Sequence, residues 1–152
     1  VFFGLTLGHT RAELFRALLE GPAFAIRHTI EILEQDSGVE VQELRIGGAA
    51  ARSAVWNQSI ADVLNKPVIA LSSSHIEVLG AAVLAGFGVG VYPTLAAGMT
   101  RVAETGRQFK PDPAAHAVYQ RLFPLYKSLY PSVAPYFQEL VELDLPQGWV
   151  DR

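Results

Sequence analysis

Two consecutive glycines followed by polar side chains make the stretch of the sequence best suited to binding chemistry. Gly47 and Gly48 precede a run of alanines, and Ser53 and Asn57 follow one helical turn apart. Glycine has no Cβ and accepts positive φ, so a ligand can approach its backbone closely. Free N–H groups at the start of a following helix favour an anion such as phosphate. Ser53 and Asn57 can hydrogen-bond a sugar or a base. The stretch favours a nucleotide, although a strand-to-helix turn without a ligand explains one Gly-Gly pair equally well.

The residues around the glycines predict the elements that hold them. Residues 41–46 indicate a short strand, and residues 68–71 indicate a second, buried strand. A helix is expected between them from about Ala51. It should end at Asn65, which accepts the left-handed conformation, and at Pro67, which cannot continue a helix. The helix is indicated by apolar residues at helical spacing, namely Trp56, Ile60, Val63 and Leu64.

A long helix is predicted before this unit. Thr10 is the expected N-cap, with Glu13 three residues later as its capping-box partner. Pro22 should kink or briefly break the helix, because proline removes a backbone donor and crowds the preceding turn. Gly38 is the expected C-cap.

Three further features are predicted after the central unit. Ser74 and Glu77 form a second capping box, opening a helix over residues 76–87. The small residues of that helix suit packing near the glycine pair. Residues 91–111 read as mostly loop, with one short helix capped by Pro93 and Thr94.

The last third of the chain predicts helices interrupted by prolines. Asp112 is a good N-cap, and Pro113 suits the first helical position. Pro124 should bend the helix that follows, and Pro131 should start another. Residues 144–152 are expected to form a loose tail.

Composition narrows the class of protein. The chain has 152 residues, of which 50% are hydrophobic, a formal net charge of −3 and no cysteine. One domain with a real core is therefore possible. Cysteine chemistry is excluded, and nothing predicts nucleic-acid binding. Apolar runs fall short of the roughly 18 residues that a membrane-spanning helix needs. We therefore expect a cytoplasmic protein without a membrane partner.

The four histidines share no ligand spacing and no Ser/His/Asp set can be assembled, so neither a metal site nor a catalytic set is predicted.

Three segments in this order resemble the C-terminal half of the FGGY carbohydrate kinases. Residues 4–21, G-L-T-L-G-H-T-R-A-E-L-F-R-A-L-L-E-G, resemble the family signature G-L-x-x-x-H-x-R-x-x-L-x-R-A-x-x-E-G. Residues 47–68 are similar to G-G-G-A-x-S-x-x-W-x-Q-x-x-A-D-V-x-x-x-P-V. The third segment is Glu77 with residues 79–85 and 88–90. Residues 111–113 resemble the xylulokinase-like branch, and order and spacing agree over residues 3–140.

The resemblance implies an α/β fold: a partial ribonuclease-H-like, or actin-like ATPase, domain that is helix-rich with few strands and covers residues 1–143. It implies an ATP-dependent kinase that phosphorylates a sugar or polyol, most like a pentulose such as xylulose or ribulose. It implies that the turn of Gly47 and Gly48 contacts the nucleotide, that Gly48 and Ala49 approach the phosphates and nucleoside, and that Ser53 stands at a polar adenosine contact. Many members have a third glycine at the position of Ala49. The methyl group of Ala49 leaves less room for a nucleotide to approach the backbone.

The resemblance also implies what lies outside this chain. The aspartate that acts as general base, and most sugar contacts, are expected on an N-terminal domain. Mg²⁺ is expected to be held mainly through ATP or ADP and that domain. The isolated chain is thus predicted to be inactive, and to form a homo-oligomer or to pair with an N-terminal fragment through an open sheet edge. Two alternatives stay open: a non-catalytic nucleotide-binding or oligomerisation module with the same fold, and a helix-rich domain without a ligand.

Overall fold

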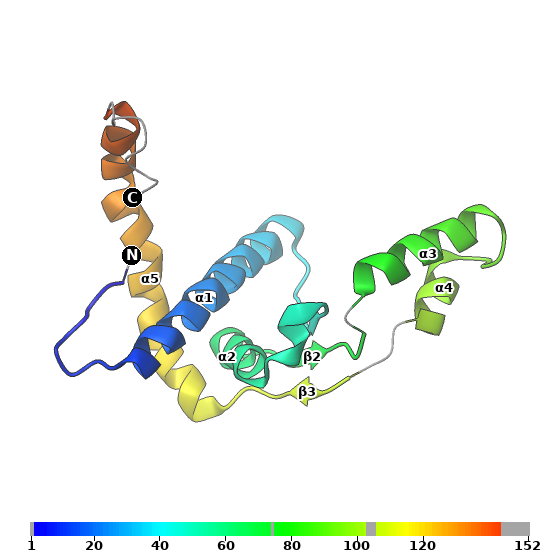
Figure 1. Ribbon diagram of the computed structural model, residues 1–152, viewed down its shortest axis with the longest axis horizontal. Helices are drawn as coiled ribbons and strands as arrows, with labels where there is room; N and C mark the ends of the chain where they lie inside the picture. Colours follow the sequence, from blue (N-terminus) through cyan, green and yellow to red (C-terminus); the bar gives the residue numbers. More distant parts are fainter. Residues whose placement is uncertain (1, 74, 103–105, 144–152) are drawn as a thin grey trace.

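A small sheet carries helices that pack around it, and a pair of helices lies to one side (Figure 1). The computed structural model describes residues 2–73, 75–102 and 106–143. Its elements, in chain order, are α1 (Arg11–Ser37), β1 (Leu44–Ile46), the 3₁₀ helix η1 (Ala49–Arg52), α2 (Ala54–Leu64), β2 (Val68–Ala70), α3 (Ile76–Gly88), α4 (Leu95–Val102), β3 (Gln108–Phe109) and α5 (Pro113–Glu142). This is the helix-rich α/β architecture with few strands that the sequence predicts.

The sheet has the order β1-β2-β3. β1 runs parallel to β2, with Leu44 opposite Val68, and β3 runs antiparallel to β2, with Phe109 opposite Val68. The core joins α1, α2, the sheet and the first half of α5. Phe24 of α1 meets Tyr119, Phe123 and Tyr126 of α5 at ring-centroid distances of 5.3–6.0 Å. α2 is the most enclosed helix, since every residue from Ser59 to Leu64 is buried.

The helix ends follow the sequence closely. Thr10 and Glu13 form the expected capping box, and Gly38 ends α1 with φ 70°. Asn65 ends α2 in the left-handed region with φ 55°. Asp112 caps α5 by accepting a hydrogen bond from the Ala114 N–H. These predictions are confirmed. They could be made from the sequence because a helix cap depends on a few neighbouring residues.

The helices are not interrupted at two of the prolines where a break or a restart is predicted. α1 is one continuous helix of 27 residues with Pro22 inside it, so the short break is absent, and the alternative of a kink stays a prediction. α5 is likewise continuous over 30 residues, and Pro131 does not start a new helix. Near Pro131, the hydroxyl of Ser128 donates to the Leu125 carbonyl, and that of Ser132 donates to the Ser128 carbonyl. A proline at position i removes the donor for the carbonyl at i−4, and these two hydroxyls add donors to other carbonyls near Pro131.

The strand predictions are right in place and wrong in extent. β1 begins at Leu44, not at residue 41, and β2 ends at Ala70. The helix expected from Ala51 is divided into η1 and α2, joined at Ser53. The loop expected over residues 91–111 contains α4, capped as expected by Thr94, and β3. A strand of two residues has no periodicity, so β3 could only be found from its pairing with β2.

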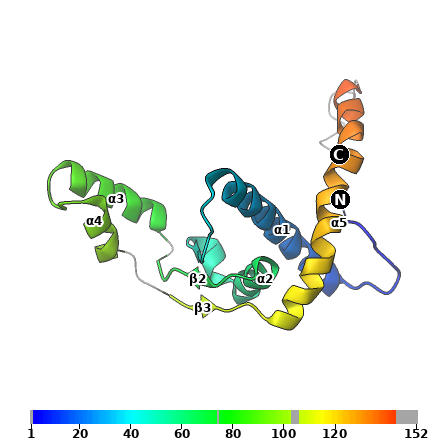
Figure 2. The ribbon, with the colours of Figure 1, turned by 180° about the vertical axis from the view of Figure 1, so that it is seen from behind.

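α3 and α4 lie beside each other, away from α1 and α5 (Figure 2). Most small residues of α3 pack on nothing in the described part of the chain, which corrects the expectation: Gly80 has no atom within 4 Å of an added Cβ, and Ala81, Ala82 and Ala85 are exposed. A Cβ at Gly86 would lie 2.6 Å from the Tyr92 ring, and one at Gly98 would lie 2.7 Å from Val83. Ser74 lies outside the described residues. His75 is the N-cap of α3 and makes no side-chain capping bond. The tail at residues 144–152 also lies outside the described part. In that part, no helix has the length and apolarity to cross a membrane.

Candidate functional site

The glycine turn lies where the two parallel strands end. Gly47 directly follows β1, and α3 begins a few residues after β2. Because parallel strands finish at the same edge of a sheet, the start of α3 comes to rest on the glycines. A Cβ at Gly47 would lie 2.5 Å from Ile76 Cδ1, and a Cβ at Gly48 would lie 3.9 Å from Glu77 Oε1. This edge is where open α/β sheets generally bind ligands.

Gly48 has a backbone conformation that requires glycine. Its φ of 72° and ψ of −157° fall in a region that other residues essentially do not adopt. It stands as the N-cap of η1 and provides no side-chain capping bond. A helix start without a side-chain cap leaves its N–H groups for another acceptor. The turn can therefore present backbone donors to an anion.

Ala49 and Ser53 lie on the exposed side of the same turn. Ala49 is the first residue of η1, and its methyl group is exposed. Ser53 is also exposed, and its Oγ accepts a hydrogen bond from the Trp56 N–H at 3.3 Å, capping α2. A serine hydroxyl that accepts one bond still has its own hydrogen to donate. The structure thus brings Gly47, Gly48, Ala49 and Ser53 together.

Asn57 is placed differently from these four residues. Its side chain is fully buried, and its Nδ2 donates to the Ala51 carbonyl at 2.8 Å. Its Oδ1 is buried without a protein partner. Asn57 therefore has no exposed surface from which to touch a ligand, contrary to the contact expected from its spacing. Its amide holds η1 against α2.

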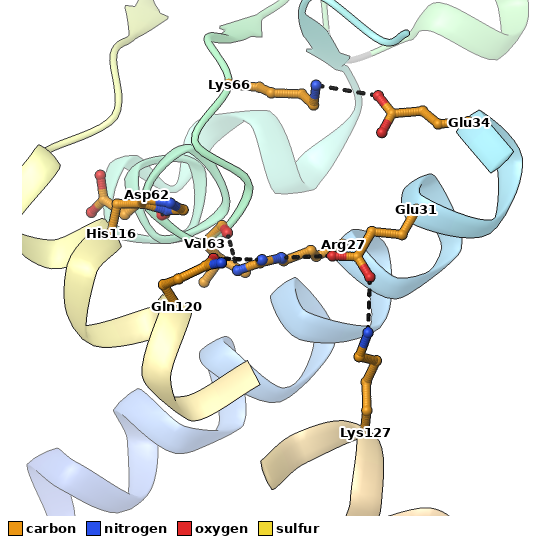
Figure 3. Close-up of polar contacts among 9 residues, drawn as sticks. All are labelled: Arg27, Glu31, Glu34, Asp62, Val63, Lys66, His116, Gln120 and Lys127. Atoms are coloured by element: carbon orange, nitrogen blue, oxygen red, sulfur yellow. Dashed lines mark hydrogen bonds and ion pairs between the residues drawn. The ribbon is translucent and has the colours of Figure 1, made fainter. Parts of the chain in front are cut away.

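Sequence reasoning missed three polar residues that hold the opposite end of α2 (Figure 3). Asp62 is 4% exposed, and its Oδ1 accepts from the Asp112 N–H and from Gln58 Nε2 at 2.8 and 2.7 Å. His116 Nδ1 donates to the Asp62 carbonyl at 2.9 Å. Arg27 Nη1 donates to the Val63 carbonyl at 3.2 Å. The signal available was the acidic residue inside the apolar run I-A-D-V-L, since a buried carboxylate needs partners.

An ion pair holds the loop after α2 to the end of α1. Lys66 Nζ lies 3.2 Å from Glu34 Oε1, as Figure 3 shows. Glu34 also accepts a hydrogen bond from the Val41 N–H at 2.8 Å. That backbone bond, followed by the bond to Lys66, lowers the pKa of Glu34. Within the described ranges, no group of three or more His, Cys, Asp or Glu side chains is arranged to hold a metal ion.

The chain belongs to the FGGY family of carbohydrate kinases. The family model for the C-terminal domain matches residues 1–89. A glycerol kinase from Rhodopirellula baltica is 36% identical over 121 residues, which are 80% of this chain and 22% of that protein. A solved xylulose kinase from Rhodospirillum rubrum is 38% identical with a TM-score of 0.77, over 91% of this chain and 28% of its own. A solved Plasmodium falciparum glycerol kinase with ADP is 25% identical with a TM-score of 0.69, over 83% of this chain and 26% of its own.

These similarities confirm the family resemblance and the fold class. The fold is a partial actin-like ATPase domain, helix-rich with a small sheet. The chain spans 22–28% of the length of the relatives just described. The similar proteins include xylulose, glycerol and autoinducer-2 kinases, so they define a carbohydrate kinase family without defining one acceptor.

Proposed function

We propose that this chain forms part of the nucleotide-binding wall of an ATP-dependent carbohydrate kinase. The observation that carries the proposal is the conformation of Gly48, which opens the start of η1 at the carboxyl edge of β1 and β2. Gly47, Gly48 and Ala49 would approach the phosphates, and Ser53 would donate a hydrogen bond to the nucleoside. Asn57 is buried, so its contribution would be to hold η1 in place. The ADP bound to the Plasmodium relative supports a nucleotide as the ligand.

The chemistry proposed is phosphoryl transfer from ATP to a hydroxyl of a sugar or polyol. This reaction depends on positioning and on neutralising charge around the transferred group. In our proposal the chain orients the nucleotide through backbone donors and supplies no general base. Mg²⁺ would neutralise phosphate charge when bound, held mainly through the nucleotide and the part of the kinase outside this chain. The isolated chain should therefore lack turnover.

For the acceptor we propose a pentulose such as xylulose or ribulose. The support is the 38% identity with the Rhodospirillum xylulose kinase. A polyol acceptor is the competing choice, supported by the 36% identity with the Rhodopirellula glycerol kinase. Comparing xylulose, ribulose and glycerol as acceptors, in a complex that contains the complete kinase, would separate the two.

Calorimetric titration of the purified chain with Mg-ADP tests the nucleotide site. We expect a dissociation constant in the millimolar range or tighter, and loss of binding in Gly48→Glu, which places a carboxylate where the phosphates would lie. Gly88→Glu is the matched control, because Gly88 is exposed at the end of α3 with no atom within 4 Å of a Cβ there. Absence of binding by a folded wild-type chain would refute the proposal, as would equal loss in both variants.

Turnover separates the kinase from a binding module. The chain alone should give no sugar phosphate, and addition of the remaining portion of a xylulose kinase should restore ATP-dependent phosphorylation. Nucleotide binding without restored turnover would favour the non-catalytic module. Phosphorylation by the chain alone would contradict the proposed division of roles.

We also propose that the chain associates through the free edge of β1. Among the described strands, β1 pairs with β2 alone, and alternation along a parallel strand directs the N–H and C=O of Arg45 to its other side. An unpaired edge invites another strand. Light scattering should detect a homo-oligomer, or a complex with an N-terminal kinase fragment. Association at this edge would be refuted if the chain is a monomer at high concentration and does not bind the N-terminal fragment.

A further inference from the structure

The last turn of α2 is held by side chains from two other helices. Arg27 of α1 donates from Nη1 to the Val63 carbonyl at 3.2 Å, and His116 of α5 donates from Nδ1 to the Asp62 carbonyl at 2.9 Å. The last carbonyls of a helix have no partner within the helix, and they carry its negative partial charge. We call Arg27 and His116 together the α2 clamp (Figure 3).

Of the two residues of the α2 clamp, Arg27 bonds to more than one helix. Its side chain is 13% exposed, and its remaining nitrogens are engaged. Nη2 donates to Gln120 Oε1 at 2.6 Å, and Nε lies 3.3 Å from Glu31 Oε1. The guanidinium carbon lies 4.0 Å from the centroid of the Phe123 ring. One planar group thus fixes α2 relative to both α1 and α5, and a planar fork gives defined directions to each bond.

The other end of α2 carries the proposed nucleotide site. Ser53 caps its first turn, directly after Gly48 and η1. α2 has 11 residues, so at 1.5 Å per residue its ends lie about 16 Å apart. An α-helix is stiff along its axis, and α2 is buried from Ser59 to Leu64, whereas Ala54 and Val55 in its first turn are exposed. A shift of its last turn therefore moves its first turn and the N–H groups before it.

We infer that Arg27 is a positioning residue for the nucleotide site, acting through the axial position of α2. The inference rests on the proposed function, since it concerns the same site. A purely stabilising role for Arg27 would change the free energy of unfolding and leave the folded geometry at the glycine turn unchanged. A positioning role changes that geometry in the folded chain.

Trp56 provides a readout that needs no ligand. It is the third residue of α2, and its side chain is partly buried against the core. Its backbone N–H donates a hydrogen bond to Ser53 Oγ. The sequence has two tryptophans, Trp56 and Trp149. In a Trp149→Phe background, the single indole N–H resonance in a ¹⁵N-labelled sample reports on the first turn of α2.

Arg27→Met removes the guanidinium, and Arg16→Met is its matched control. Arg16 also lies on α1, also pairs with a glutamate four residues later (Glu20), and also reaches α5 by donating to Tyr119 Oη at 2.6 Å. Unlike Arg27, it makes no bond to α2 in the described contacts. Both variants should lower the unfolding temperature.

The expected result is specific to Arg27→Met. Under conditions where circular dichroism shows both variants folded, Arg27→Met should shift the Trp56 indole resonance. It should also raise the Mg-ADP dissociation constant about five-fold or more, equivalent to roughly 1 kcal/mol. Arg16→Met should do neither. Arg27→Lys restores the charge without the planar fork, so its values should lie between those of wild type and Arg27→Met.

An unshifted Trp56 resonance in folded Arg27→Met would overturn the inference, and so would an equal shift in Arg16→Met. If the wild-type chain does not bind Mg-ADP, the proposed function fails, and the Trp56 resonance still decides whether Arg27 sets the position of α2. If Arg27→Met does not fold, Arg27→Lys and Gln120→Ala carry the same comparison, because each weakens one part of the contact network.

Discussion

Alanine at each of the two glycines should destabilise the chain for a different physical reason. At Gly48, the space for a methyl group exists, since Glu77 Oε1 at 3.9 Å is the nearest atom. The cost there comes from the backbone, and such strain amounts to about 1–3 kcal/mol. At Gly47, the Cβ would lie 2.5 Å from Cδ1 and 2.8 Å from Cγ2 of Ile76. The cost there is steric overpacking, also about 1–3 kcal/mol.

A double-mutant cycle with Ile76→Ala separates these reasons. Removing the Ile76 side chain makes room at Gly47, so Gly47→Ala should cost less in the Ile76→Ala background, with a coupling of about 1 kcal/mol or more. Backbone strain at Gly48 is unaffected by Ile76, so Gly48→Ala should be additive to within about 0.5 kcal/mol. Urea unfolding followed by circular dichroism measures all the free energies. Additivity at Gly47 would refute the contact with Ile76, and unchanged stability of Gly48→Ala would refute the strained conformation.

Further consequences concern packing, helix propensity and pH. Gly106→Ala should destabilise strongly, because a Cβ there would collide with a backbone carbonyl of β2; a wild-type urea midpoint would contradict the approach of this segment to the strand. Gly80→Ala, in the interior of α3 with no atom within 4 Å of the added Cβ, should stabilise by up to about 1 kcal/mol, seen as a higher unfolding temperature. The pKa of Glu34 is lowered, first by the Val41 N–H, so its stabilisation is present above the unfolded-state pKa of about 4.3 and is lost as pH falls through the lower folded value. Wild type should therefore be more stable than Glu34→Gln at pH 7, with the difference vanishing at acid pH; a difference independent of pH would contradict this.

Local signals in the sequence identify where α2 ends, but not the side chains that hold its last turn. The glycine pair and the Asn65 C-cap each depend on conformations of adjacent residues, so the sequence predicts them. The side-chain cap at Ser53 is not among the predictions, which begin this helix near Ala51. Arg27 and His116 come from helices that are 36 and 54 residues away from their partners along the chain. No spacing rule connects such residues, and only the packing of α1 and α5 on α2 reveals them. β3 escaped prediction for the same reason, since its partner lies on a distant strand.

Asp62 illustrates how a family motif combines binding and architecture. It stands in the run A-D-V of the same family pattern that contains the glycines proposed to bind nucleotide, but at the other end of α2. Yet its carboxylate is buried and accepts from the first N–H before α5 and from Gln58. Its own carbonyl receives His116. Asp62 thus joins α2 to the start of α5, and the motif specifies both the glycine turn and the support of the helix that follows it. A substitution at Asp62 should therefore weaken the α2–α5 junction before it affects any contact at the glycine turn.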